Sequence, residues 1–582
     1  MTPLHFAGSP GYLHEAGGDC LVLMAGAVGY EQLCVQRMWR DFAERIAAAG
    51  YPVLRFDWAG CGDALGSDAD PQRCDAWEQS FTDALTYARS TLGMKRIAVV
   101  GMRLGALIAA RVLAATGDVE AMAILAPPAN GRMHARELAA LAKVIGTREP
   151  PPGVPGIAEG DFEVAGFLVT AQTRADMEVY DLRKLAARPA AKVQLLTQPG
   201  LASAQALAEH LVSLGADVES GSFEGYQELM AQPTFSTTNE APLLAVIDWL
   251  KANAPLNTGT MPLPALPPAR LATGHYVEES VILGGEGPIA AVWCRPVRDA
   301  HPAAVLFVNA GGNPRAGWAR MNVDFARTLA SDGITSLRID VAGLGDSPPV
   351  TGRKEQVMYE ADPRRDVAVA VDALRAAGFA QVMIFGLCSG AHLAFHTAVE
   401  HEGVTGFVLV NLQKFIWRAT DRFDIALRNA SFRSNEHYKA ALRRKDTWLR
   451  LMRGDINVTG ITRAVSRRLL RTLGTRAASA GRGLGLVDDD TAKVRRWFRD
   501  LSKRGARGLV IFSAEDGGLD EVFLHMGAHG RDLTRLPGMD LQIIEGADHN
   551  VTPGWARRQL ISIVRRFLLD QAKPEATRSA AQ

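Results

Sequence analysis

The chain has 582 residues, 47% of them apolar and 22% charged, and this length and composition indicate a soluble globular protein with more than one domain. The net charge is only +1, which argues against bulk attraction to nucleic acid or anionic lipid. The six cysteines are sparse and none has CxxC spacing, so neither a disulfide framework nor a zinc site is indicated. Because the sequence has no secretory signal and no apolar run of about 18 residues, we expect a cytoplasmic protein without a membrane span.

An internal repeat organises the chain. In the first half, an apolar run ending at Gly26 is followed by a helix, a strand leading to Asp57 and a glycine turn around Arg103. The second half repeats this order, with a strand leading to Asp340 and a glycine turn around Cys388. The aspartate and the centre of the turn are 46 positions apart in the first half and 48 in the second. Short apolar strands that alternate with amphipathic helices predict an α/β fold in two tandem copies, each with a mostly parallel, doubly wound sheet.

The boundary between the copies lies in a proline-rich segment. Residues 254–272 contain prolines that cannot continue a helix and favour extended conformations. We therefore expect a first domain over residues 1–253, a linker over 254–272 and a second domain over 273–572. Residues 573–582 are expected to form a disordered tail.

Charge is distributed unevenly between the two copies. Residues 1–256 carry 20 basic and 29 acidic side chains, whereas the remainder carries 44 basic and 34 acidic ones. The positive surplus is concentrated in residues 418–507, with 23 Lys or Arg against 9 Asp or Glu. This segment interrupts the expected order of strands and has helical periodicity, so it predicts a basic helical lid on the second domain. On charge alone, an ordinary solvated helical face is an equal alternative.

A nucleophile elbow is indicated in the second copy. Gly386 and Gly390 flank Cys388 at two positions on either side, directly after a strand and before a helix. The central residue of such a turn is strained, and only small residues fit around it. The glycines therefore favour Cys388 over Ser389 as the nucleophile, and they make a merely buried cysteine the weaker interpretation.

These motifs resemble the α/β-hydrolase superfamily, in which the chain order is nucleophile, acid, histidine. The resemblance implies a triad of Cys388, Asp516 and His549, since Asp516 and His549 follow the next two expected strands. Asp520 is a second candidate for the acid and Asp548 a third. His549 would deprotonate the thiol, and the acid would fix the tautomer of the imidazole.

The oxyanion hole of this superfamily uses two backbone N–H groups. Ser389, the residue after the nucleophile, would supply one of them. The loop that contains Gly311 and Gly312 follows an earlier strand and would supply the other, although an ordinary glycine turn fits this loop as well. No cofactor or metal site is indicated.

The first copy lacks these functional groups. Arg103 occupies the position of the nucleophile, and the loops that would carry the acid and the histidine contain neither. Asp57 and Asp63 recur in the second copy as Asp340 and Asp346, and we interpret all four as structural. The first copy is thus predicted to be a pseudo-enzyme domain. It resembles, more loosely, the hydrolases encoded beside bacterial exopolysaccharide export systems, in the segments Pro3-Leu-His-Phe6 and Arg55-Phe-Asp57.

A cysteine elbow narrows the expected chemistry. It resembles the elbows of carrier-protein aminoacyl shuttle enzymes, polyhydroxyalkanoate synthases and dienelactone hydrolase, and thiolates exchange readily with thioesters. We therefore expect an acyltransferase or thioesterase that acts on an ester or thioester, with an acyl carrier protein or coenzyme A as the candidate acyl donor. A plain esterase or lactonase and a noncatalytic interaction protein remain alternatives. The sequence does not decide the oligomeric state.

Overall fold

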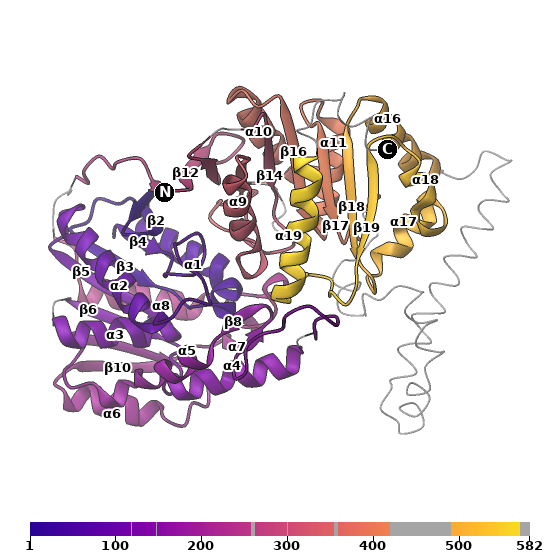
Figure 1. Cartoon of the computed structure of the whole chain (residues 1–582). Helices are drawn as coiled ribbons and strands as arrows, with labels where there is room; N and C mark the ends of the chain where they lie inside the picture. Colours follow the sequence, from indigo (N-terminus) through magenta and orange to yellow (C-terminus); the bar gives the residue numbers. More distant parts are fainter. Residues whose placement is uncertain are drawn as a thin grey trace, which may run out of the picture.

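A computed structural model describes residues 1–117, 119–146, 148–257, 262–298, 301–353, 359–418 and 490–570. It contains two large sheets, one in each half of the chain, with helices on both faces of each (Figure 1). The predicted α/β fold with two mostly parallel sheets is confirmed.

The first sheet has eight strands. Its strands, in spatial order, are β1 (Thr2–Phe6), β2 (Ser9–His14), β4 (Val53–Phe56), β3 (Cys20–Ala25), β5 (Arg96–Met102), β6 (Ala121–Leu125), β9 (Lys192–Thr197) and β10 (Asp217–Ser222). The β1–β2 and β2–β4 pairs are antiparallel and the others are parallel. The central strands are buried on both faces, which explains why they read as unbroken apolar runs rather than as alternating patterns.

The second sheet repeats this topology with one strand added at its edge. Its strands, in spatial order, are β11 (Arg270–Ala272), β12 (Tyr276–Leu283), β13 (Ile289–Pro296), β15 (Thr335–Ile339), β14 (Ala303–Phe307), β16 (Gln381–Leu387), β17 (Gly406–Val410), β18 (Arg507–Ser513) and β19 (Met539–Ile544). From β14 onward the neighbouring strands are parallel. Without β11, the strand order equals that of the first sheet, as the sequence repeat predicts.

Helices cover both faces of each sheet, and their buried sides fill the cores. In the first half they are α1 (Tyr30–Ala48), α2 (Arg73–Ser90), α3 (Leu104–Thr116), α4 (Gly131–Ile145), α5 (Ala171–Asp176), α6 (Ala204–Ser213), α7 (Tyr226–Leu229) and α8 (Ala241–Asn253). In the second half they are α9 (Met321–Ser331), α10 (Asp362–Ala376), α11 (Ser389–Glu400), α16 (Asp490–Lys503), α17 (Gly518–Met526), α18 (Arg531–Thr534) and α19 (Gly554–Leu569). A small hairpin of β7 (Phe162–Val164) and β8 (Phe167–Val169) stands apart from the first sheet.

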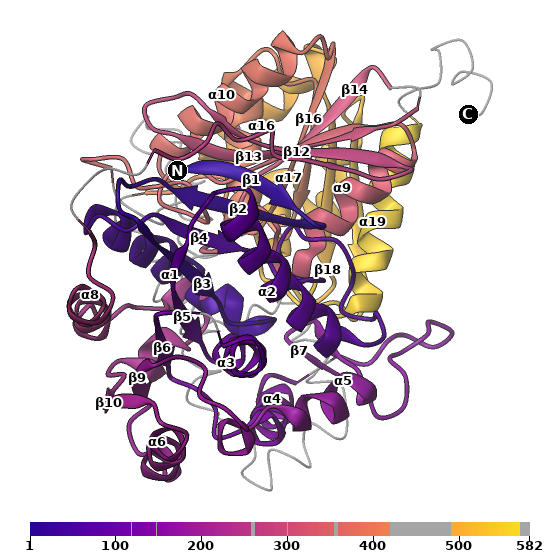
Figure 2. The same ribbon diagram turned by 90° about the vertical axis from the view of Figure 1, so that its left-hand side faces the viewer.

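The two halves meet at the antiparallel ends of their sheets. Strand β1 lies against β11 and β12, and Figure 2 shows β1 and β2 beside the start of the second sheet. The core of the first half also includes Trp318 and Ala319 of the second half. The halves are therefore packed together through buried side chains rather than joined only by a linker.

The expected linker ends in regular structure, which the sequence did not predict. The end of the expected linker is strand β11, which pairs with β12, and Tyr51 Oη donates a hydrogen bond to Ala254 O at the start of the linker. Residues 419–489 of the predicted lid and the predicted tail lie outside the described residues. The described end of the lid segment is α16, whose Val494 and Phe498 are buried in the core of the second half.

Helix α16 therefore forms the described helical part of the crossover that the parallel strands β17 and β18 require. The lid itself stays a prediction. Among the described residues, no helix has the length and apolarity needed to cross a membrane.

Candidate active site

The turn between β16 and α11 places Cys388 at its apex. Cys388 has a φ of 55°, in the left-handed region that non-glycine residues rarely adopt. A Cβ atom at Gly386 would lie 2.1 Å from Gly390 O, and one at Gly390 would lie 2.3 Å from Asn309 O. Both flanking positions therefore require glycine. Ser389 is the first residue of α11 and does not occupy the strained apex.

The loops after β18 and β19 bring a carboxylate and an imidazole together. Asp516 Oδ2 lies 2.6 Å from His549 Nδ1, and both side chains are almost completely buried. Burial by itself lowers the pKa of His549, but the charges of Cys388 and Asp516 and hydrogen bonds to both raise it well above its usual value. The structure thus brings together the three residues that the sequence proposes as a triad.

The geometry distinguishes among the three candidate acids. Asp516 contacts the imidazole directly, whereas the carboxylate of Asp548 accepts hydrogen bonds from Thr552. Asp520 lies in the first turn of α17. Asp516 Oδ1 also accepts a hydrogen bond from the backbone N–H of Gly518, at 2.8 Å. This bond fixes the carboxylate so that its other oxygen, Oδ2, faces His549.

Several side chains around this site were not found by sequence reasoning. Gln413 Nε2 donates to Asp516 Oδ1 at 2.8 Å, and Asn411 Nδ2 donates to His549 O at 2.6 Å. Both residues come just after strand β17. The polar pair at the end of this strand is the sequence signal that could have predicted their place in the site. These bonds connect the acid and the histidine loop to the segment that follows β17.

Tyr359 forms an aromatic wall next to the nucleophile. Its ring stacks on Trp417 with centroids 4.4 Å apart and lies 4.9 Å from His392. Burial and the neighbouring Cys388 sulfur raise the pKa of Tyr359. The phenol therefore stays neutral and can donate a hydrogen bond toward the sulfur or a bound substrate.

The predicted oxyanion loop is close to the elbow, but one donor is already engaged. The N–H of Gly311 donates to Ser389 Oγ at 2.8 Å. The N–H of Ser389 lies in the first turn of α11, where backbone N–H groups have no acceptor within the helix. Gly312 lies beside Gly311 on the same loop, and both glycines face Pro233 and Thr234 of the first half.

The corresponding turn of the first half keeps its shape but contains different chemistry. Arg103 has a φ of 53°, and a Cβ atom at Gly105 would lie 2.0 Å from Gly26 O. The Arg103 guanidinium lies 2.8 Å from Glu31 and 2.7 Å from Glu137. Arg103 is therefore the buried cation of an ion-pair cluster and offers no nucleophile.

The same cluster provides ligand types that metals use. Glu31, His134 and Glu137 have ligand atoms within 4.8 Å of one another. The Arg103 guanidinium already contacts both carboxylates, and it holds the pKa of Glu31 below its usual value although burial opposes this. A cation placed here would be repelled by the guanidinium, so we assign no metal to this cluster.

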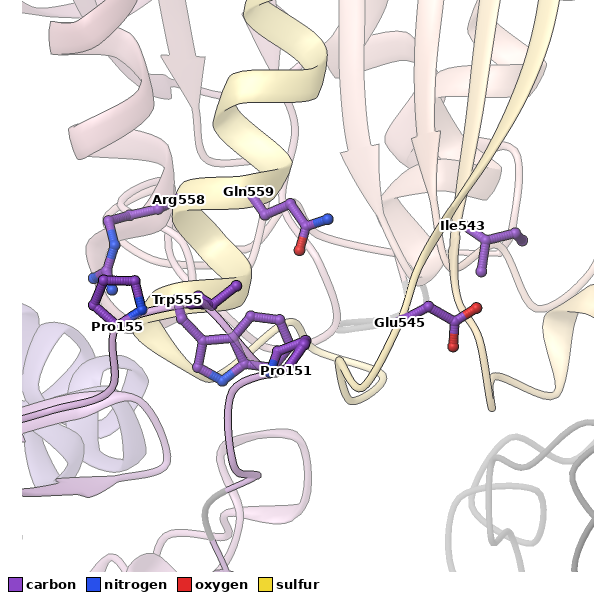
Figure 3. A pocket seen from close by; sticks show the side chains of 8 residues that line it. Pro151, Pro155, Ile543, Glu545, Trp555, Arg558 and Gln559 are labelled. Carbon is purple, nitrogen blue, oxygen red and sulfur yellow. The ribbon is translucent and has the colours of Figure 1, made fainter.

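A cavity of about 740 Å³ lies beside the end of β19 and the start of α19. Figure 3 shows Pro151 and Pro155 of the first half facing Trp555 and Arg558 of α19, with Glu545 of the β19 end across the gap. None of the three candidate triad residues lines this cavity. It is a groove between the two halves rather than the chemical centre.

Comparison with known structures finds fold relatives that align with about half of the chain. An α/β serine hydrolase without lid from Xanthomonas campestris is 13% identical with a TM-score of 0.30, covering 52% of this chain and 99% of its own. An esterase from Pyrococcus furiosus is 13% identical with a TM-score of 0.31, covering 53% and 98%. A dienelactone hydrolase from Anabaena variabilis is 14% identical with a TM-score of 0.30, covering 51% and 98%. No curated protein matches the sequence.

Family models identify each half. An α/β-hydrolase family model matches residues 305–558, which include the elbow and the two loops that follow β18 and β19. The serine aminopeptidase S33 family model matches residues 35–181 in the first half. Together with the repeated strand order, these matches show that the chain belongs to the α/β-hydrolase superfamily and consists of two tandem copies of its fold.

Proposed function

We propose that the second half cleaves or transfers acyl groups through an acyl-enzyme formed on Cys388. The observation that carries this proposal is the contact of His549 with both Cys388 and Asp516, which follow strands β19, β16 and β18 of one sheet. A base beside the nucleophile and a carboxylate on its other ring nitrogen are the parts that nucleophilic acyl transfer needs. The family matches support hydrolase activity in general, without a particular nucleophile or acyl donor.

The proposed reaction has two balanced halves. His549 takes the thiol proton of Cys388, and the sulfur attacks the acyl carbon of an ester or thioester. The tetrahedral oxyanion collapses, and the leaving alcohol or thiol takes the proton back from His549. Water or an acceptor alcohol or thiol then attacks the thioester on Cys388, loses its proton to His549 and releases the acyl product and the free thiol.

The nature of the nucleophile favours thioester donors. Exchange between two thioesters is nearly balanced, which suits a shuttle more than an irreversible hydrolase. We propose that coenzyme A or the phosphopantetheine of an acyl carrier protein presents the acyl group. The positive surplus of residues 418–507 would attract the phosphate. Raising the salt concentration should then raise KM for a phosphopantetheine thioester but leave KM for a small neutral ester unchanged, because exposed attractions are screened.

The first half is proposed to be a pseudo-enzyme. Its elbow carries Arg103 in place of a nucleophile, and the guanidinium is enclosed by Glu31 and Glu137. Its role in the reaction is therefore indirect.

Intact-protein mass spectrometry tests the proposed chemistry. The full chain is incubated with acyl-coenzyme A and, separately, with a p-nitrophenyl acyl ester, and the site of any adduct is located by peptide mapping. We expect the mass of one acyl group on Cys388, and its transfer to an added acceptor thiol. Release of free acid at the same rate with and without acceptor would favour the plain esterase or lactonase. If neither an adduct nor turnover is found with either donor, the noncatalytic alternative is favoured.

A further inference from the structure

A hairpin of the first half reaches the catalytic loops of the second. Strands β7 and β8 are joined by Ala165 and Gly166, which have φ values of 49° and 88°. Two such residues form the tight turn that fits a two-residue hairpin. The indole N–H of Trp318 donates to Ala165 O at 2.6 Å, and Arg557 Nη2 donates to Gly166 O at 2.9 Å. The tip of the hairpin is thus bound from two sides by the second half.

The two partners of the tip belong to different parts of the candidate active site. Trp318 begins the short helical turn that follows the Gly311 loop, and Arg557 lies in the first turn of α19, directly after the His549 loop. Arg557 also donates from Nη1 to Thr552 O within the His549 loop. The hairpin therefore bridges the oxyanion side and the histidine side of the site.

The space at the tip leaves no room for a side chain. A Cβ atom at Gly166 would lie 2.2 Å from Thr552 O and 2.4 Å from Arg557 Nη1. Because Thr552 is three residues beyond His549, the backbone of the hairpin fixes one end of the histidine loop. The other end is the edge strand β19.

A buried carboxylate on the hairpin makes a second attachment. Glu163 of β7 is only 5% exposed, and its Oε1 accepts a hydrogen bond from the N–H of Gly554 at 3.0 Å. Gly554 is the first residue of α19, where a negative charge is stabilised by the helix dipole and by unpaired N–H groups. Glu163 therefore fixes the start of the helix at which the histidine loop ends.

Other first-half contacts reach the remaining catalytic loops. Arg148 Nη1 lies 2.9 Å from Glu515 Oε2, next to the candidate acid Asp516, and Arg148 O accepts from the indole of Trp555. A Cβ atom at Gly312 would lie 3.2 Å from Pro233 O. The loops that contain Asp516, His549 and Gly312 are thus all in contact with the first half.

We infer that the β7–β8 hairpin of the first half is a positioning element for the active site of the second half, with Glu163 as its principal positioning residue. This inference rests on the proposed function, because it gives the Cys388–His549 pair its role. Glu163 does not touch the reacting atoms. It acts by holding the His549 loop where the imidazole can meet both the Cys388 sulfur and the Asp516 carboxylate.

The test follows the reactivity of Cys388 rather than overall stability. The full chain and its Glu163→Ala, Glu163→Gln and Gly166→Ala variants are alkylated with iodoacetamide over a range of pH, and modification of Cys388 is measured by peptide mapping. Thermal unfolding of each variant shows that it is folded. The values of kcat and KM for an acyl thioester are measured in parallel. Glu159→Ala is the matched control, because Glu159 is an exposed acid just before the same hairpin.

Glu163→Ala should slow alkylation of Cys388 at pH 7 about tenfold, because His549 would no longer be held beside the sulfur. It should lower kcat with little change in KM. Glu163→Gln keeps an acceptor oxygen and should retain most of the parental profile. Gly166→Ala should behave like Glu163→Ala, and it decides the question if Glu163→Ala does not fold. Glu159→Ala should match the parent.

A parental alkylation profile in both folded variants, Glu163→Ala and Gly166→Ala, would overturn the inference. A merely structural hairpin would lower the unfolding temperature without slowing the alkylation of Cys388. The alkylation readout does not require turnover. Failure of the proposed function would instead be seen as turnover that persists in Cys388→Ala, so the two failures are distinguishable.

Discussion

Arg55 Nη1 of the first half lies 2.9 Å from Asp346 Oδ1 of the second, and both side chains are only 6% exposed. The repeat contains the reciprocal pair, because Arg338 and Asp63 occupy the equivalent positions in the opposite halves. Arg338 Nη2 lies 3.1 Å from Asp63 Oδ1, again buried. The equivalent surfaces of the two copies thus face each other. Each supplies the arginine of one pair and the aspartate of the other, as in a two-fold symmetric dimer.

Arg315 lies at the centre of this arrangement. It contacts Asp63 of the first half and both Asp340 and Asp346 of the second, at 2.6 to 2.8 Å. Of the aspartates that recur in both copies, Asp63 and Asp346 therefore join the halves, which agrees with their interpretation as structural. Pairs and hydrogen bonds of this kind satisfy charges that burial would otherwise destabilise.

Removing one partner of a reciprocal pair should destabilise the interface. Asp346→Ala leaves Arg55 and Arg315 buried with less countercharge, and we expect the free energy of unfolding to fall by about 3–5 kcal/mol. Chemical denaturation measures this change, and a double-mutant cycle with Arg55→Met measures the coupling. Asp248→Ala is the control, because its ion pair with Lys251 is exposed and should contribute at most about 1 kcal/mol. Equal costs for both variants would contradict the importance of the buried pairs.

The elbow geometry predicts different outcomes at adjacent residues. Cys388→Ala should lower turnover at least about a thousandfold, since it removes the nucleophile. Ser389→Ala removes the acceptor of the Gly311 N–H, a loss of about 1 kcal/mol that corresponds to about a fivefold lower kcat. Steady-state kinetics on one thioester would compare them. An inactive Ser389→Ala beside an active Cys388→Ala would reverse the assignment of the nucleophile.

His549→Ala removes the base that would take the proton of the Cys388 thiol, and only the thiolate reacts with alkylating agents. We expect alkylation of Cys388 at pH 7 to slow at least about tenfold and kcat to fall by about 10²–10⁴. Asp548→Asn is the comparison, because Asp548 contacts Thr552 rather than the imidazole. Unchanged alkylation in His549→Ala would argue against the pairing of sulfur and imidazole.

Arg103→Met should separate stability from catalysis. Glu31 would lose its buried counterion, and we expect the free energy of unfolding to fall by about 3–5 kcal/mol. Adding Glu31→Gln should restore part of this loss, because it removes the unpaired charge. In folded protein kcat should equal that of the parent, since a guanidinium cannot attack an acyl carbon. A loss of kcat comparable to that of Cys388→Ala would refute the pseudo-enzyme assignment.

Asp57 predicts a pH dependence of stability. Burial, followed by the charge of Asp63, raises the pKa of Asp57 to about 7, whereas an unfolded chain has a value of about 3.9. The folded state therefore binds the proton more tightly between these values, and the contribution of Asp57 to stability is full below about pH 4 and lost as pH rises through 7.

At pH 8 we expect the free energy of unfolding of Asp57→Asn to exceed that of the parent by up to about 4 kcal/mol. Its advantage should shrink as pH falls toward 4. Urea titrations of the parent, Asp57→Asn and the exposed-site variant Asp248→Asn at pH 5 and pH 8 would measure this. A constant difference between Asp57→Asn and the parent across pH would show that Asp57 does not titrate in this range.

Local patterns in the sequence predicted much of the fold. The buried parallel strands read as apolar runs, and the order of strands and helices repeats because the two copies have the same topology. The elbow around Cys388 was found because its strained φ requires glycines at fixed neighbouring positions. Such features depend on residues a few positions apart, so the sequence displays them directly.

The choice among Asp516, Asp520 and Asp548 depended on the tertiary structure. All three are acids near the expected loops, but only the path of the loop after β18 brings Asp516 to His549. The hydrogen bond from the Gly311 N–H to Ser389 Oγ could likewise not be predicted from the sequence, because it joins residues 78 positions apart.

The sequence by itself determined that the chain contains two α/β-hydrolase copies, with a possible nucleophile in the second and an arginine in its place in the first. Only the tertiary structure decided how the copies act together. Glu163 and Gly554 are 391 positions apart, and Arg55 and Asp346 are 291 apart. The physical reason is that periodicity and backbone strain are encoded locally, whereas the contacts between two folded surfaces depend on how their shapes and charges dock.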